Sequence, residues 1–248
     1  MKSSAFQSYS MKHVHFYDEE VPILLQSGLA LARELAKKPR IVDLGCGDGR
    51  LIFALHKRRL FKDADEVLGV DVSKTRIERL AKELPFVKCI VSDALNVKGL
   101  SRSSFDYVIC SQLIEHVTDD EMLMLEIRRL LKDGGLVYLS SVIKKWYGAY
   151  FYFSGGSFRL DPSHVREYPS VNEFLHLLEG KGFEVISART QQVTVPLVDL
   201  FARLLVEVGL LEMNMDFFQQ HKALSKARGL RTPAVGYSSV EVLAKKLE

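Results

Sequence analysis

The sequence contains little cysteine. Its 248 residues include three cysteines, and Cys46, Cys89 and Cys110 are odd in number and far apart in the chain. Such a set predicts neither a disulfide framework nor a structural zinc site. The fold must therefore depend on an apolar core, and a chain of this length is long enough to bury one within a single domain.

Long apolar runs are also missing. No apolar stretch approaches the roughly 18 residues that cross a bilayer, and the first twenty residues contain no apolar core followed by a small-residue cleavage site. Hydrophobic residues make up 47% and charged residues 26% of the chain, as in ordinary globular proteins. We therefore expect no transmembrane segment, no secretory signal and a cytoplasmic location.

The sequence also lacks a large excess of charge of either sign. Lys and Arg total 34 against 31 Asp and Glu, a net charge of +3, which is too small to argue for a nucleic-acid partner. Two local basic clusters, "HKRR" (56–59) and "KARGLR" (226–231), leave RNA open as an alternative partner. Solvated helix ends are the commoner origin of such clusters.

What the sequence does contain is an alternation of short apolar runs with amphipathic stretches. The runs predict strands buried on both faces, at 40–44, 66–71, 86–91, 105–110 and 135–141. Helices are predicted at 19–38, 49–58, 73–84, 119–135 and 170–183. Strand and helix in this alternation predict an α/β fold, with a doubly wound, mostly parallel sheet covered on both faces.

The C-terminal part follows a different pattern. Residues 183–195 and 236–247 alternate apolar and polar residues as strands do. The stretch 196–228 between them is patterned as a helix. We expect the two strands to pair as an antiparallel hairpin at the sheet edge, with a helical insertion before the last strand.

The loop "VDLGCGDGR" (42–50) is the strongest candidate binding element. It follows a predicted strand and opens a predicted helix, the place where doubly wound sheets bind ligands. Its glycines, which allow close backbone approach, are Gly45, Gly47 and Gly49. The dinucleotide pattern G-x-G-x-x-G fails because Arg50 takes the place of the third glycine. Asp43 and Asp48 would also repel a pyrophosphate by a few kcal/mol, so the loop favours a cationic ligand.

This loop and four later motifs resemble the class I S-adenosylmethionine-dependent methyltransferases. The motifs are "VDLGCGDG" (42–49), "GVDVS" (69–73), "VSDAL" (91–95), "FDYVICSQLIEHV" (105–117) and "LLKDGGLVYLSS" (130–141). Five motifs in the family's order are far more specific than one glycine loop. The resemblance spans residues 38–142 and implies a Rossmann-like sheet of seven strands, S-adenosyl-L-methionine as cofactor and methyl transfer as the activity.

The resemblance also implies the cofactor-binding residues. Asp71 would accept the ribose hydroxyls, while Asp93 and the Ala94 N–H would contact the adenine. The full set is Asp43, Gly45, Cys46, Gly47, Gly49, Asp71, Val72, Asp93, Ala94 and Ser111. Acids suit a ligand that carries a sulfonium and an ammonium against one carboxylate. Each aspartate also has a simpler interpretation, as a turn or helix-cap residue.

Three residues are candidates for the chemistry. Glu115 and His116 follow the fourth strand, at the rim that faces the transferable methyl in this family. His164 lies in "RLDPSHVREYPSVNEF" (159–174), which resembles an H-x-R-x-Y segment beside the active site of small-molecule members. We favour His164 over His116 as general base, since His116 is as well explained by packing. A metal site formed by the histidines with Glu115 is an alternative, since some family members use a divalent ion. No spacing specifies one, and Gln112 stands where metal-dependent RNA-end members carry a glutamate.

The stretch "KKWYGAYFYFSGGSF" (144–158) is rich in aromatic residues. It predicts a lid or wall for an apolar or ring-bearing acceptor, with a core hairpin, a homodimer interface or contact with a lipid membrane as alternatives. We expect methyl transfer, most often to oxygen, on a small-molecule, lipid-precursor or saccharide acceptor. RNA methylation and a non-catalytic binding protein are the alternatives, although the second should have lost the cofactor acids.

These expectations divide one methyltransferase domain, residues 1–248, into segments. In chain order they are an N-terminal helical region (1–38), the cofactor-binding core (39–142), the aromatic lid or substrate segment (143–169), the helical insertion (196–228) and the last strand (236–247).

Overall fold

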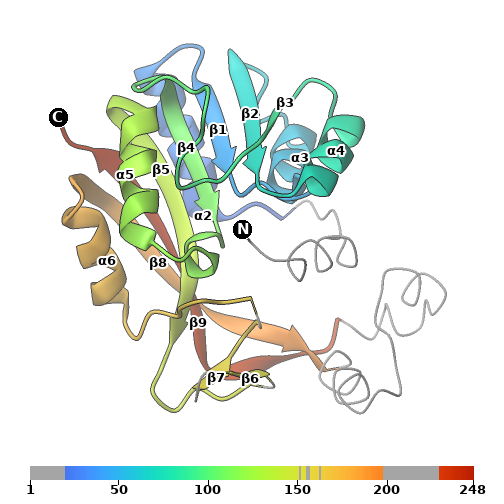
Figure 1. Ribbon diagram of the computed structural model, residues 1–248, viewed down its shortest axis with the longest axis vertical. Coiled ribbons are helices and arrows are strands. Elements are labelled where there is room, and N and C mark those ends of the chain that lie inside the picture. Colours follow the sequence, from blue (N-terminus) through green and yellow to red (C-terminus); the bar gives the residue numbers. More distant parts are fainter. Residues whose placement is uncertain (1–19, 151, 155–156, 162, 198–228) are drawn as a thin grey trace.

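A single sheet of seven strands organises the part of the chain that the computed structural model describes, residues 20–150, 152–154, 157–161, 163–197 and 229–248. The strands run in the order β3-β2-β1-β4-β5-β9-β8 (Figure 1). Their bounds are β1 Arg40–Leu44, β2 Glu66–Asp71, β3 Lys88–Val91, β4 Phe105–Ser111, β5 Leu131–Lys144, β8 Phe183–Pro196 and β9 Arg231–Lys246. Two short strands, β6 Tyr152–Ser154 and β7 Ser157–Arg159, pair separately.

The sheet is mostly parallel, as predicted. Strands β1 to β5 are parallel neighbours, β9 is antiparallel to both β5 and β8, and together they form the expected doubly wound, Rossmann-like arrangement. The predicted C-terminal hairpin is present, with β8 at the sheet edge and the reversed strand β9 between β8 and β5.

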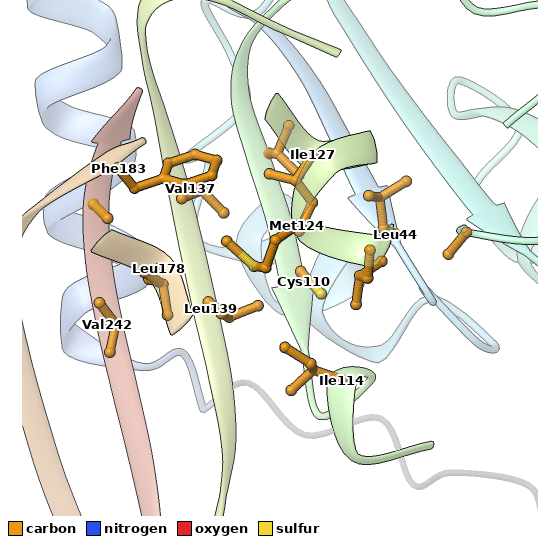
Figure 2. Close-up of a cluster of buried hydrophobic side chains, with 14 of the residues drawn as sticks. Leu44, Cys110, Ile114, Met124, Ile127, Val137, Leu139, Leu178, Phe183 and Val242 are labelled. Atoms are coloured by element: carbon orange, nitrogen blue, oxygen red, sulfur yellow. The ribbon is translucent and has the colours of Figure 1, made fainter. Parts of the chain in front are cut away.

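Helices cover both faces of the sheet because its strands are apolar on both sides. Their bounds are α2 Ile23–Leu35, α3 Arg50–Lys57, α4 Lys74–Glu83, α5 Asp120–Leu130 and α6 Val171–Glu179, with a 3-10 turn, η1, at Ile114–His116. Helix α5 buries Met124 and Ile127 against β4 and β5, and α6 buries Leu178 in the same cluster beside Leu139 and Val242 (Figure 2). Helices α2, α3 and α4 pack on the opposite face, around Tyr107 and Tyr138.

Helix α5 is shorter than predicted. Its start is as expected, since the Asp119 side chain accepts a hydrogen bond from the Met122 N–H and caps the first turn. The predicted helix 119–135 was wrong at its end, because the chain turns to extended backbone at Leu131, which pairs with Phe105 of β4. Sheet pairing therefore overrides the helical pattern of the last five residues.

The β8–β9 hairpin runs past the helices and ends beside β6 and β7 (Figure 1). Val142, Ala234 and Tyr237 form a small separate core there. Two predicted segments lie largely outside the described residues: the start of the N-terminal region (1–19) and all but the first two residues of the insertion 196–228. Among the residues that are described, no helix is long and apolar enough to cross a membrane.

Candidate active site

A cavity of about 440 Å³ opens at the carboxyl ends of β1, β2 and β4. These strands are parallel neighbours, so the loops that follow them meet at one edge of the sheet. The size suits a small-molecule ligand. Six of the ten predicted cofactor residues line it: Asp43, Gly45, Cys46, Gly47, Asp71 and Ser111.

The glycine loop is shaped by positive backbone angles and by close packing. Gly45 and Gly47 have φ of 72° and 56°, a region that favours glycine, and the N–H groups of Gly45 and Cys46 both donate to the Val70 carbonyl. A Cβ added at Gly45 would lie 2.8 Å from a Leu113 methyl carbon. The loop therefore presents bare backbone to the cavity. Gly49 caps α3 with φ of 83° and packs against α4, outside the cavity lining.

Two buried carboxyl groups lie beside this loop. Burial and the neighbouring Asp71 carboxylate raise the pKa of Asp43 to about 8, although Arg50 lowers it. Burial also raises the pKa of Asp71, opposed by hydrogen bonds from the Ser73 and Gly47 N–H groups at 2.8 and 3.0 Å. Asp71 thus braces the loop, and each of its oxygens retains a second lone pair. A cationic ligand would offset the cost of ionising this pair.

The remaining predicted cofactor residues lie outside the cavity lining. Asp93 is exposed and its Oδ1 accepts from the Leu95 N–H at 3.0 Å, which is a turn contact. Ala94 is buried, and Val72 is 42% exposed. Strands β2 and β3 are paired at their ends, where the Ser92 N–H donates to the Asp71 carbonyl. Asp93 therefore belongs to the same edge of the sheet as Asp71.

Sequence reasoning missed two arginines. Arg50, at the start of α3, and Arg76, on α4, line the cavity near the acids, whereas the sequence suggested a site of acids alone. Arg76 is 8% exposed. Asp48, which was expected to face the ligand, instead contacts Arg79 at 3.3 Å. The position of Arg50, where a dinucleotide loop has its third glycine, was the available signal; nothing in the sequence singled out Arg76.

The three predicted catalytic residues come together at the other end of the cavity. His116 and His164 line it, and their rings make an edge contact with centroids 4.9 Å apart. Glu115 is fully buried, and its Oε2 accepts from the Ser141 hydroxyl at 3.0 Å. Burial raises the pKa of Glu115 to about 7, partly opposed by its own backbone N–H and by His164. A proton can therefore be held or exchanged here near neutral pH.

The H-x-R-x-Y segment sets the position of His164. The Val165 N–H donates to the Glu115 carbonyl at 2.8 Å, which fixes the segment against η1. Arg166 pairs with Asp120 at 2.8 Å, and Tyr168 donates to the same carboxylate at 2.9 Å. The predicted inward placement of His164 is thus present, whereas its arginine and tyrosine anchor the segment to α5.

Beyond the histidines the cavity becomes apolar. Its lining continues through Val142, Tyr150, Leu160, Val193 and Val195. A second, more open cavity of about 480 Å³ adjoins it and shares Tyr150 and Val195 in its lining. Of the aromatic stretch, Tyr150 and Phe158 line these cavities, while Trp146 is 94% exposed.

The fold and the site define a doubly wound α/β domain with a glycine loop and buried acids at its ligand edge. Residues 42–139 match the methyltransferase domain family. The chain is 32% identical to the ubiquinone biosynthesis O-methyltransferase of Neisseria meningitidis serogroup A over 42% of this chain and 44% of that one, and 27% identical to that of Acinetobacter baylyi over 59% and 63%. It spans about half the length of the curated relatives it matches. The family match and these relatives support the resemblance of residues 42–139 to class I S-adenosylmethionine-dependent methyltransferases.

Solved structures share the fold over nearly the whole chain. A methyltransferase-like protein from Bacillus halodurans matches with a TM-score of 0.62 and 17% identity, over 90% of this chain and 100% of that one. A phosphoethanolamine N-methyltransferase of Haemonchus contortus, solved with S-adenosylhomocysteine, matches with a TM-score of 0.56 and 18% identity, over 90% of this chain and 52% of that one. The cyclase SpnF matches with a TM-score of 0.56 and 20% identity, over 90% of this chain and 81% of that one. Because the last of these is a cyclase, the fold alone does not fix the reaction.

Proposed function

We propose that the protein transfers a methyl group from S-adenosylmethionine to a hydroxyl oxygen of a small, largely apolar, ring-bearing acceptor. The observation that carries this proposal is the continuity of one cavity. It joins the glycine loop and its acids to His116 and His164, and then to an apolar lining. A charged donor and an uncharged acceptor would therefore meet in one space, next to groups that can accept a proton.

The residues present suit this cofactor. A Cβ at Gly45 would lie 2.8 Å from a Leu113 methyl carbon and one at Gly47 would lie 3.4 Å from an Arg76 nitrogen, so the loop stays bare beside the cavity. Asp43 and Asp71 would supply negative charge for the sulfonium and ammonium. Arg50 and Arg76 supply positive charge for the single carboxylate. A bound S-adenosylmethionine supplies an already activated methyl group, so the chain has only to align and deprotonate the acceptor.

The acceptor's proton must leave as its oxygen attacks. His164 is held by Glu167, whose Oε1 lies 2.8 Å from the Nδ1 atom, in the arrangement that orients a histidine base. His164 lines the cavity together with His116. His164 therefore remains the favoured proton acceptor, with Glu115 and His116 beside it.

The acceptor class follows from the apolar end. Aliphatic side chains and Tyr150 line the space beyond the histidines, which suits a ring or hydrocarbon better than a saccharide. The relatives named ubiquinone biosynthesis O-methyltransferases support a ring hydroxyl as the reacting group. Neither feature favours RNA.

The direct test is calorimetric titration of S-adenosylmethionine and S-adenosylhomocysteine into wild type, Asp71→Ala and the exposed control Asp63→Ala. Loss of charge-assisted hydrogen bonds should weaken binding by about tenfold or more in Asp71→Ala and leave the control unchanged. Wild type should also form S-adenosylhomocysteine with an alkyl-substituted catechol and not with glucose or a short RNA. Equal affinities in all three proteins, or no turnover of any ring hydroxyl, would refute the proposal.

A further inference from the structure

Glu115, His116 and His164 form a cluster of metal-ligating side chains. One ligand-type atom from each lies within 4.8 Å of the other two. The cluster joins segments 48 residues apart, because the Val165 and Arg166 N–H groups both donate to the Glu115 carbonyl. The resemblance suggested these three residues as one group, although only the Glu115–His116 pair is local in the sequence.

Each of the three side chains is oriented by a second group, as metal ligands are. His164 Nδ1 lies 2.8 Å from Glu167 Oε1, and His116 Nδ1 lies 3.1 Å from the Ser163 hydroxyl. Glu115 accepts from Ser141 through Oε2. Because these contacts use Nδ1 of both imidazoles, Nε2 is the atom of each ring that is placed to ligate.

The surrounding charge also suits a cation. Glu167 is 4% exposed in its side chain and also accepts from the Leu160 N–H at 2.7 Å, and Asp161 accepts from Ser163. With Glu115, three carboxyl groups thus surround two imidazoles. Lys144, whose Nζ is 4.0 Å from Glu167 Oε2, forms an ion pair with Glu167. Burying this many carboxyl groups together is costly without further positive charge.

We propose that Glu115, His116 and His164 bind one divalent cation at the acceptor end of the cavity. Two imidazoles and one carboxylate favour zinc or a first-row transition ion over calcium or magnesium. Because His116 and His164 line the cavity, the remaining coordination positions would face the acceptor. The rival arrangement is a network of two histidines that takes the proton without any ion.

The chemical consequence rests on the function proposed above. A hydroxyl placed against the cation would lose its proton to solvent near neutral pH. The oxygen then forms the bond to the methyl carbon as the carbon–sulfur bond breaks, with the electron pair passing to sulfur. His164 would serve as a ligand in that case, and not as the base.

The experiment is calorimetric titration of Mn²⁺ and Zn²⁺ into tag-free full-length protein stripped with a chelator. We expect wild type to bind one ion per chain. The affinity for the ion should be weaker by about 10- to 100-fold in Glu115→Gln and His164→Gln. Glu167→Gln, which changes the carboxylate that orients His164 but no proposed ligand, should weaken the affinity for the ion by about tenfold. His176→Gln is the matched control, because His176 and Glu179 form a similar pair at 3.3 Å on the exposed face of α6.

Circular dichroism and S-adenosylhomocysteine affinity establish that each variant is folded. The inference is overturned if wild type binds neither ion saturably, or if the cluster variants bind as tightly as His176→Gln does. If the protein binds S-adenosylhomocysteine but no metal ion, only the cation site is refuted and the proposed function stands. Metal binding without S-adenosylhomocysteine binding would refute the proposed function and leave the cation site standing.

Discussion

The buried carboxyl group of Asp43, which we propose faces the cofactor, lowers the stability of the folded protein. It lies at the end of β1, 3% exposed, beside Asp71. Its carboxyl group has a pKa of about 8 in the folded protein and about 3.9 in the unfolded chain. Between these values the unfolded chain releases a proton that the folded protein keeps. Rising pH therefore favours unfolding, until the folded group also ionises near pH 8.

The Asp43→Asn variant should consequently be more stable than wild type when no ligand is bound, and the gain should grow with pH. We expect it to be on the order of a few kcal/mol at pH 8.5 and about 1 kcal/mol at pH 5, while affinity for S-adenosylmethionine falls. Thermal melts at both pH values measure this, with exposed Asp63→Asn as the control. The same gain at pH 5 and pH 8.5 would show that Asp43 does not titrate in this range.

Helix α2 illustrates how an element is fixed on the sheet by one small residue. Gly28 faces β4 and β9, and a Cβ there would lie 2.3 Å from the Tyr107 hydroxyl oxygen and 2.7 Å from a Leu243 methyl carbon. The same hydroxyl donates to the Leu25 carbonyl at 3.2 Å. The helix therefore approaches the sheet more closely than any larger residue at this position would allow.

Replacing Gly28 with alanine should therefore destabilise the protein. Alanine is favoured over glycine in a helix by roughly 1 kcal/mol. Overpacking costs about 1–3 kcal/mol, and a contact as short as 2.3 Å should cost close to the upper value. We expect a net loss of about 1–2 kcal/mol in urea unfolding. Ser27→Ala, one residue away and exposed, should change stability by less than about 0.5 kcal/mol. A stabilised Gly28→Ala would mean that α2 shifts freely.

Most strands could be predicted from the sequence, because a short apolar run between turn residues is compatible with few structures other than a buried strand. The bounds of β1 and β2 agree with the sequence prediction. The end of α5 could not be predicted, since "LLKDGG" continues a helical pattern and only pairing with Phe105 shows otherwise. β6 and β7 form a hairpin that the sequence offered only as an alternative for the aromatic stretch, because strands of three residues carry almost no periodicity.

For the whole molecule, the glycine loop and its acids were predictable because they are local motifs at strand ends. The contact of His164 with Glu115 and His116 was only suggested by the resemblance, since it joins η1 to a segment 48 residues later. The apolar end was beyond prediction. Val142, Val193 and Val195 come from β5 and β8, which β9 separates in the sheet, and no local pattern marks them as neighbours of one cavity.

Under the proposed function this arrangement would separate the two binding functions, because the core strands would carry the cofactor end and the C-terminal hairpin would carry part of the acceptor end. Val193→Trp should fill the apolar lining, raise the KM for a ring-bearing acceptor by about tenfold or more, and leave S-adenosylhomocysteine affinity within about twofold. Ile186→Trp, on the same strand and 44% exposed outside the cavity, is the control. Steady-state kinetics with calorimetry measures both effects. A fall in cofactor affinity equal to the rise in KM would show that the two ends of the cavity are not separate.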